Sequence, residues 1–210
     1  MTERSFIFVL LFQKKMTKAE RTRQFIIEKS APIFNTKGVA GTAMSDIMEV
    51  TKLAKGSMYV HFDSKEELSY AAVDFNLESL SGKIMVVINK HKTAKNKLFA
   101  FVDFLSDPLH PPIAGGCPML NFGMEADDTS PVIKQKVNKL IQTAQQVVAD
   151  IIEQGIIDAE FKNSWDSKEF AIKAFAMIEG GVLTSRVAGN NDQMNILTRM
   201  IKQEIEQNSI

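Results

Sequence analysis

The sequence of 210 residues predicts an all-α fold, and three observations lead to this prediction. Apolar residues recur every three or four positions through most of the chain, which is the spacing of one buried helix face. We find no stretch in which apolar and polar residues alternate over the length of a strand. Capping signals and breaks rich in Pro and Gly divide the chain into segments of helix length.

The first helix begins after Thr17, because Thr17 and Glu20 stand at the spacing of a capping box. It ends near Gly38, since glycine takes the left-handed conformation of a helix C-terminus most readily. The next segments are a second helix, a tight turn and a short third helix, at about residues 42–50, 51–54 and 55–62.

A long fourth helix starts at Ser64, where Ser64 and Glu67 form a second capping-box pattern. Pro and Gly interrupt the chain at residues 108–117, and Ser130 followed by Pro131 indicates the start of another long helix. Helical spacing of apolar residues accounts for the rest, at about residues 94–105, 131–152, 167–187 and 194–205.

Charge is balanced overall but not along the chain. The sequence has 25 basic and 25 acidic residues, yet residues 14–65 hold ten Lys or Arg and five Asp or Glu, a local charge of +5. A basic N-terminal third indicates a surface for a polyanion, although a solvated basic face would give the same pattern. The single cysteine, Cys117, excludes an intrachain disulfide and is typical of a reducing, cytoplasmic location.

The N-terminal residues 1–16 stand apart from these helices. They contain an apolar run at residues 6–12, which is far shorter than the roughly 20 residues of a membrane span. It also lacks the cleavage signal of a secretory leader. We interpret residues 1–16 as an N-terminal extension, either disordered or translated from an upstream start codon, with Met16 as the natural start.

Residues 42–68 carry the functional signal. Two short helices joined by a tight turn form a helix-turn-helix, whose second helix lies in the major groove of DNA. That helix needs small and polar residues at its start so that its backbone approaches the duplex, and Lys55, Gly56 and Ser57 supply them. Tyr59 and His61 can donate to phosphate oxygens, a contact that positions a protein without reading sequence.

Lys65 stands beside the free amides of the next helix, where anions bind readily. Taken singly, each of these residues has an ordinary interpretation. Tyr59 could be a half-buried core residue, His61 a surface or satisfied core histidine, and the lysines solvated. Their order and spacing together favour a DNA interface.

Three runs of this sequence resemble the N-terminal domain of the TetR/AcrR family of transcriptional regulators. They are Gly38, Thr42 and Ile47 at their spacing, KGSMYVHF from Lys55 to Phe62, and SKEEL from Ser64 to Leu68. The resemblance implies an all-α protein with a three-helix helix-turn-helix DNA-binding domain at residues 17–65. Residues 66–210 would form a larger helical domain for ligand binding and dimerisation. By the same resemblance, the DNA contacts would be Thr42, Lys55, Gly56, Ser57, Tyr59, His61 and Lys65.

The resemblance further implies a function and partners. The chain would be a ligand-responsive, DNA-binding transcriptional regulator, a repressor released from a palindromic operator by a small apolar molecule. Its partners would be double-stranded operator DNA, an unknown small-molecule effector and a second copy of itself, with no cofactor and no membrane. The last two helices would form the homodimer, because Gly180 and Gly181 allow close approach of helices.

The turn departs from the family pattern. The family usually has glycine where Lys52 stands, so we expect either a strained lysine or a different turn. Ala54 replaces the serine that often caps the third helix, which costs about 1 kcal/mol of local stability. Ala43 stands where a second hydroxyl is common.

A ligand pocket among helices is usually apolar with a few polar groups. Our candidate lining residues are Phe101, Phe104, Met119, Phe122, Met124 and Phe175. Each could equally be plain core. Cys117 could be a redox sensor, but no basic cluster surrounds it in sequence, so we favour a structural role.

Two other function classes find little support. A helical enzyme lacks sequence signals, because the chain has no Gly-rich phosphate loop, HExxH or CxxC, and we assign no catalytic residue. Glu125, Asp127 and Asp128 resemble a metal cluster, but a solvated loop explains them better, so we predict no metal site. A membrane-associated helical protein would have to use the apolar run at residues 6–12.

Overall fold

The computed structural model describes residues 16–210 and confirms the all-α prediction. These residues form nine helices and no strand beyond one isolated bridge between Phe161 and Ser209. The interpretation of residues 1–16 as an extension lies, except for Met16, outside the described residues. The helices are α2 (Lys18–Gly41), α3 (Met44–Thr51), α4 (Lys55–Tyr59), α5 (Lys65–Ile88), α6 (Ala94–Phe104), α7 (Pro118–Ala126), α8 (Pro131–Ile157), α9 (Ser167–Ala188) and α10 (Asp192–Asn208).

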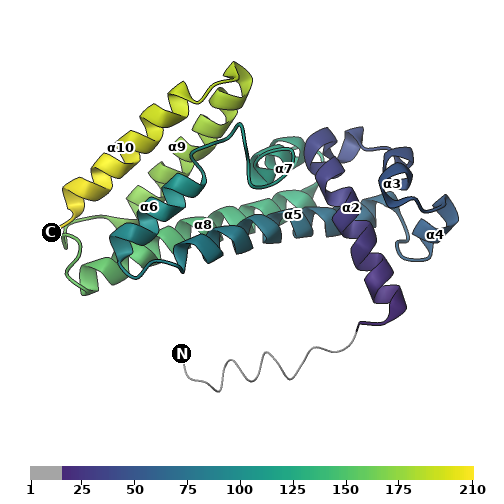
Figure 1. Ribbon diagram of the computed structural model, residues 1–210, viewed down its shortest axis with the longest axis horizontal. Coiled ribbons are helices and arrows are strands. Elements are labelled where there is room, and N and C mark those ends of the chain that lie inside the picture. Colours follow the sequence, from purple (N-terminus) through teal and green to yellow (C-terminus); the bar gives the residue numbers. More distant parts are fainter. Residues whose placement is uncertain (1–15) are drawn as a thin grey trace.

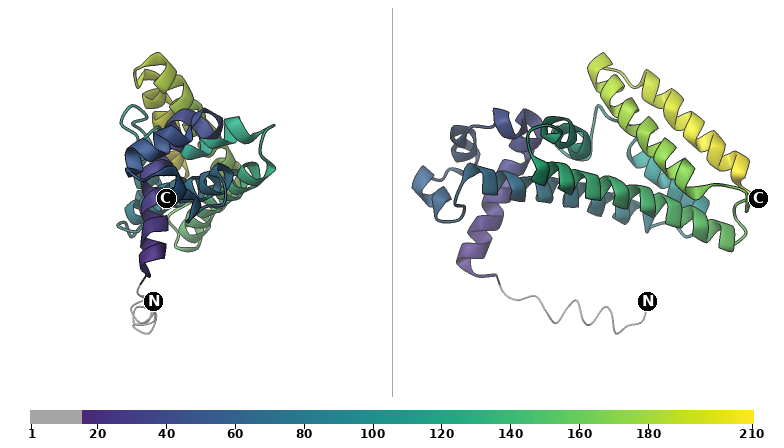
Figure 2. Two further views of the ribbon diagram at one scale, coloured as in Figure 1. Left: turned by 90° about the vertical axis from the view of Figure 1, so that its right-hand side faces the viewer. Right: turned by 180° about the vertical axis from the view of Figure 1, so that it is seen from behind.

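The molecule is elongated, and two long helices span most of its length. Figure 1 shows α5 and α8 side by side along the long axis, with α2, α3 and α4 at one end. The pair α9 and α10 lies toward the other end, with α6 packed against α8 and α10 (Figure 2). The short helix α7 contacts α2, α5 and α8, so it joins the two ends.

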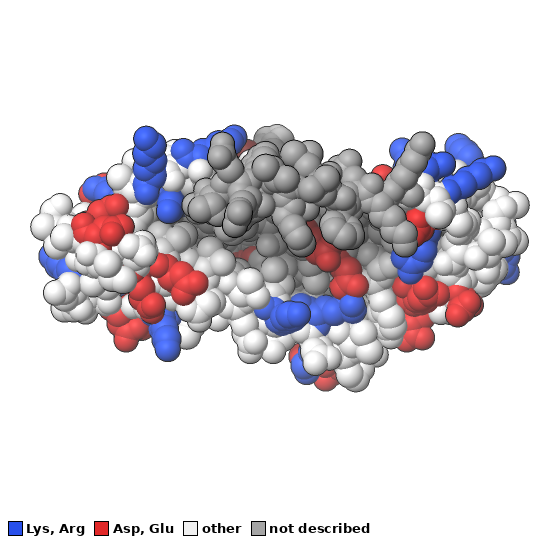
Figure 3. All heavy atoms as spheres, turned by 90° about the horizontal axis from the view of Figure 1, so that it is seen from below, with Lys and Arg blue, Asp and Glu red and all other residues white. Residues whose placement is uncertain are grey.

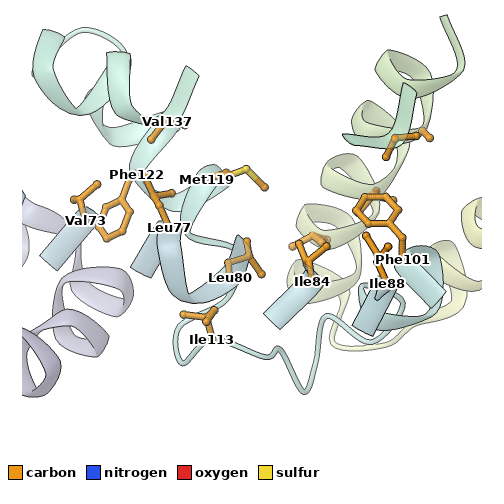
Figure 4. Packing of buried hydrophobic residues seen from close by; sticks show 14 of the residues in the cluster. Val73, Leu77, Leu80, Ile84, Ile88, Phe101, Ile113, Met119, Phe122 and Val137 are labelled. Carbon is orange, nitrogen blue, oxygen red and sulfur yellow. The ribbon is translucent and has the colours of Figure 1, made fainter. Parts of the chain in front are cut away.

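One continuous core runs along α5. Figure 4 shows side chains of α5 meeting side chains from α6, α7, α8 and the 108–117 segment. The labelled residues are Val73, Leu77, Leu80, Ile84, Ile88, Phe101, Ile113, Met119, Phe122 and Val137. Because buried side chains of α2 to α4 belong to the same cluster, the domain boundary predicted after residue 65 stays a prediction. It falls at the first residue of α5.

The helix ends follow local chemistry. The Thr17 hydroxyl accepts from the Glu20 amide at 3.2 Å and the Glu20 carboxylate accepts from the Thr17 amide at 2.7 Å, so this capping box is complete. At Ser64 the pattern is only half formed. The Ser64 hydroxyl accepts from the Glu67 amide at 3.1 Å, but the Glu67 carboxylate accepts from the amide of Asp63 at 2.7 Å.

Gly38 breaks the first helix, as its position predicted. Its φ of +77° and ψ of 169° interrupt the helical dihedrals within α2. Side chains other than hydrogen are strongly disfavoured in this backbone region. The chain therefore turns at Gly38 and enters the helix-turn-helix by a separate short helical segment, residues 39–41.

Candidate nucleic-acid interface

The turn between α3 and α4 contains Lys52 in a strained backbone conformation, which is one of the two outcomes expected from the sequence. Lys52 adopts the left-handed conformation, with φ 56° and ψ 24°, and its amide donates to the Met48 carbonyl at 2.9 Å. A non-glycine residue in this conformation costs about 1 kcal/mol. The structure therefore keeps the usual turn geometry and places an exposed lysine at its tip.

Buried residues hold the two helices of the motif together. Ile47 of α3 is fully buried and Met58 of α4 is 1% exposed. Between them, the buried hydroxyl of Thr51 donates to the Ile47 carbonyl at 2.7 Å. Ala54 caps α4 without a side-chain hydrogen bond, as its residue type predicted. Packing rather than capping thus fixes the orientation of this five-residue helix.

The outer face of α4 presents the predicted contact residues to solvent. Lys55, Gly56 and Ser57 are exposed, and a Cβ added to Gly56 would meet no atom within 4 Å. Tyr59 is 44% exposed, while His61 is half-buried just beyond the helix. Five predicted residues therefore lie together on or beside α4, with Met58 facing inward.

Thr42 and Lys65 are placed differently. Thr42 is only 1% exposed, and its hydroxyl donates to the Gly38 carbonyl at 2.6 Å. The ammonium group of Lys65 donates to the Thr42 carbonyl at 2.6 Å. Both side chains thus have partners inside the protein, and the Lys65 hydrogen bond ties the start of α5 to the segment between α2 and α3.

Acidic residues of this end are engaged with neighbouring donors. Lys37 lies 2.8 Å from Asp46, and its hydrogen bond, with that of the Ala43 amide, lowers the pKa of Asp46. The Asp63 amide and Arg23 lower the pKa of Glu67. Among the described residues, Lys52 and Lys55 have no acidic partner within 4 Å. Figure 3 shows basic side chains gathered along one edge of this end and acidic ones along the other.

Glu125 of α7 forms hydrogen bonds with the end of α2, which leads into the helix-turn-helix. Its carboxylate accepts from the amides of Val39 at 2.8 Å and Ala40 at 2.7 Å. A Cβ on Gly38 would lie 2.8 Å from Glu125 Oε2, so glycine is needed for this approach as well as for its positive φ. Sequence reasoning treated Glu125 as part of a solvated acidic loop and missed this role. The described residues hold no group of three potential metal ligands.

A second contact between α7 and α2 lies one turn earlier. The Asn121 amide donates to the Asn35 carbonyl at 2.9 Å, and the Asn35 amide donates to the carbonyls of Ala114 and Gly116 at 2.7 and 3.0 Å. Asn35 is 2% exposed. The two asparagines therefore connect α2, α7 and the 108–117 segment through buried polar contacts.

The candidate pocket residues do not share one cavity. Met119, Met124 and Phe175 line a cleft of about 780 Å³ between α7, α8 and α9. Phe101 and Met119 line an apolar cavity of about 30 Å³, and Phe104 lines another of similar size. Phe122 faces a groove of about 470 Å³ between α7 and the start of α5.

Glu179 of α9 also lines the cleft of about 780 Å³ between α7, α8 and α9. Sequence reasoning did not identify this residue. The Cys117 thiol donates to Glu179 Oε1 at 3.2 Å. Burial, and then the charge of Glu179, raise the pKa of the Cys117 thiol, and burial raises the pKa of Glu179. The raised pKa favours the protonated form of this half-buried thiol, and the structural role of Cys117 stays a prediction.

The outer surfaces of α9 and α10 are apolar. On α9, exposed residues of small or apolar type recur at helical spacing, namely Ile172, Ala176, Gly180, Leu183 and Val187. On α10, Ile196 and Met200 are 48% and 51% exposed. Apolar faces of this extent usually mark a contact surface.

Among the described helices, none is long and apolar enough to cross a membrane.

Two family profiles match the chain. One, described as "Bacterial regulatory proteins, tetR family", matches residues 26–72. The other, described as "Tetracyclin repressor-like, C-terminal domain", matches residues 94–201.

Solved structures match almost the whole chain. A TetR-family transcriptional regulator from Cytophaga hutchinsonii is 33% identical, with a TM-score of 0.89, and the match covers 94% of this chain and 99% of that one. A TetR transcriptional regulator from Chloroflexus aurantiacus is 34% identical, with a TM-score of 0.87 and coverage of 92% and 98%.

A sequence relative matches most of the chain as well. The transcriptional repressor DhaR from a Mycobacterium species is 21% identical over 178 residues, or 82% of this chain and 86% of DhaR.

Proposed function

The chain belongs to the TetR family of transcriptional regulators, and on that premise we propose that it is a ligand-responsive repressor. It binds a palindromic operator as a homodimer and is released by a small, largely apolar molecule. The observation that carries this proposal is the exposed face of α4, where Lys55, Gly56, Ser57 and Tyr59 project from a rigidly packed helix.

The placement of side chains sharpens the set of proposed DNA contacts. We assign direct contacts to the exposed residues on and beside α4, namely Lys55, Gly56, Ser57, Tyr59 and His61. Thr42 and Lys65 act instead as supports, because their polar groups are engaged within the protein. Lys52 adds an exposed positive charge at the tip of the turn.

The homodimer rests on the apolar faces of α9 and α10. Pairing these faces with their copies removes from water the exposed side chains of Ile172, Leu183 and Val187, which is favourable in proportion to the area buried. A two-fold dimer of helix-turn-helix units places its reading helices about 34–36 Å apart, one turn of DNA. This spacing is what makes a palindromic operator the matching partner.

Release by a ligand requires a connection between the cleft and α4, and α7 supplies it. Met119 and Met124 of α7 line the cleft, while Asn121 and Glu125 hold α2 on the two sides of its break at Gly38. A ligand that shifts α7 therefore disturbs the hydrogen bonds that orient the helix-turn-helix. The coupling is energetic only to the extent that the ligand prefers one position of α7.

The test is selection of bound fragments from a random DNA pool with the full chain, followed by affinity measurements at several salt concentrations. We expect a palindromic site and a steep loss of affinity with salt. Lys55→Ala should weaken binding to all sequences and reduce the salt slope by about one, and Tyr59→Phe should weaken binding similarly across sequences.

The matched control is Lys90→Ala, which removes an exposed lysine just beyond α5, far along the chain from α4. It should leave both affinity and salt slope unchanged. Failure of the wild-type chain to enrich any DNA sequence would overturn the proposal, and unaltered binding by both α4 variants would overturn the assignment of contacts.

A further inference from the structure

Glu179 is half-buried, and its carboxylate has one enclosed oxygen for which the described residues provide no hydrogen-bond donor. Oε1 accepts from the Cys117 thiol, a weak donor, at 3.2 Å. Oε2 is shut off from solvent, and no donor among the described residues reaches it. An acceptor left unsatisfied in this way carries the full cost of its lost hydration. A hydrogen-bond donor placed beside Oε2 would therefore stabilise this carboxylate.

Glu179 lies beside a space that is large enough for a small molecule. The residue lines the cleft of about 780 Å³ between α7, α8 and α9, a volume in the usual range for small-molecule sites. It also lines the small cavity beside Cys117. A molecule that fills the cleft contacts this side chain, and its donor reaches the enclosed Oε2 once the carboxylate turns toward the cleft. Leu120, Ile141 and Phe175 offer the same molecule apolar surface.

The charges around the cleft favour a cation over an anion. Three charged residues line it, namely Asp127, Lys134 and Glu179. Lys134 lies 2.7 Å from Asp127, so its charge is already compensated. Among the described residues, Glu179 is then the charged group of the cleft that has no counter-ion within 4 Å. Phe175 precedes Glu179 by four residues on α9 and so lies on the same side of the helix, where an aromatic face also attracts cations.

We propose that the effector is an amphipathic organic cation, an apolar molecule whose protonated amine donates to the Glu179 carboxylate. This inference rests on the proposed function, since it names the chemical class of the ligand that acts in that function. An ammonium group supplies both the missing donor and the missing counter-charge, and hydrogen bonds between charged groups are about twice as strong as neutral ones. Neutral ligands supply at most the first, and carboxylic acids supply neither once ionised.

The experiment offers the full chain a panel of hydrocarbon skeletons, each as a primary amine, an alcohol and a carboxylic acid. Phenylbutylamine, phenylbutanol and phenylbutyric acid form one such set. Binding is measured by isothermal titration calorimetry and by the shift in melting temperature. We expect the best amines to bind about tenfold or more tightly than the matching alcohols, and the acids to bind weakest.

Two variants locate the preference. Glu179→Gln should abolish the advantage of amines over alcohols while leaving the affinity for alcohols within about twofold, because glutamine keeps the shape but not the charge. Asp127→Asn removes the other acidic side chain of the cleft and should keep the amine preference. Absence of amine binding across the panel, or an amine preference that survives in Glu179→Gln, overturns the proposal.

The outcome is separable from that of the proposed function. If neutral or acidic compounds release the chain from its operator while amines do not, ligand-responsive repression stands and the cation inference fails. If amines bind through Glu179 but leave DNA binding unchanged, the cation site stands and the link to release fails.

Discussion

Carboxylates at the helix-turn-helix end and in the cleft between α7, α8 and α9 differ in their hydrogen bonding and in the direction of their pKa shifts. At the helix-turn-helix end, Asp46 and Glu67 each accept hydrogen bonds from a backbone amide and a basic side chain, and their pKa values are lowered. In the cleft, Glu179 is half-buried with a thiol as its only described donor, and burial raises its pKa. The first arrangement stabilises the fold, whereas the second gives up stability that a bound ligand can restore.

The largest expected effect concerns the joint between the two regions. Gly38→Ala should lower the free energy of unfolding by about 2–3 kcal/mol, because alanine is strained at a φ of +77° and its Cβ meets the Glu125 carboxylate. Urea denaturation measures the loss. Gly82→Ala, in open space on α5, is the matched control and should raise stability by about 0.5–1 kcal/mol.

The two causes can be separated in a second background. In a chain that already carries Glu125→Ala, the contact is gone and only the backbone strain remains. A smaller penalty for Gly38→Ala there would assign the difference to the contact. A Gly38→Ala variant as stable as the wild type would show that neither strain nor contact operates at this joint.

A smaller effect is expected at the tip of the turn. Lys52→Gly should raise the free energy of unfolding by about 1 kcal/mol, because glycine adopts the left-handed conformation without steric cost. Lys52→Asn tolerates the same conformation and tests whether charge loss contributes. Measured DNA affinity should fall in both variants if Lys52 faces phosphate, so stability and binding should move in opposite directions. No gain in stability in either variant would contradict the strain at this turn.

The pH dependence of stability gives the finest comparison. Glu67 has a lowered pKa in the folded protein, so its contribution is present above its ordinary value of 4.5 and is lost as pH falls through the folded value. Glu179 has a raised pKa, so its folded state is favoured below 4.5 and stability is lost as pH rises through the folded value.

Substitution by glutamine should therefore act in opposite directions. Glu67→Gln should destabilise the chain at neutral pH and approach the wild type in acid. Glu179→Gln should gain stability relative to the wild type as pH rises toward neutral. Urea denaturation across this pH range checks both, and parallel curves for the two variants would contradict the contrast between the regions.

Local signals explain what could be predicted from the sequence. Thr17 and Gly38 act through the backbone of their own turn, so residue type and spacing are sufficient to predict their conformations. The order of the helices follows from the same kind of signal. For Lys52 the family resemblance left two alternatives, a strained lysine or a different turn, and the structure has the strained lysine. The exposed face of α4 was also predictable, because Met58 and its neighbours separate into an inner and an outer side within a single turn.

Tertiary contacts explain what could not be predicted. Glu125 meets Val39 across 86 positions, and Cys117 meets Glu179 across 62, and neither spacing leaves a mark in the sequence. Thr42 and Lys65 carry groups that could serve DNA or the protein interior equally well. The packing of α5 against the segment after α2 gives Lys65 its partner, whereas the Thr42 hydroxyl meets the Gly38 carbonyl four residues earlier.

The two sides of α7 have a consequence for engineering this regulator. Asn121 and Glu125, four residues apart, face α2, while Met119, Leu120 and Met124 line the cleft. In the proposed function, the residues that contact the ligand and those that hold α2 thus lie on separate sides of one nine-residue helix. We expect a library that randomises only the cleft side to change which compound is bound while leaving the contacts to α2 in place.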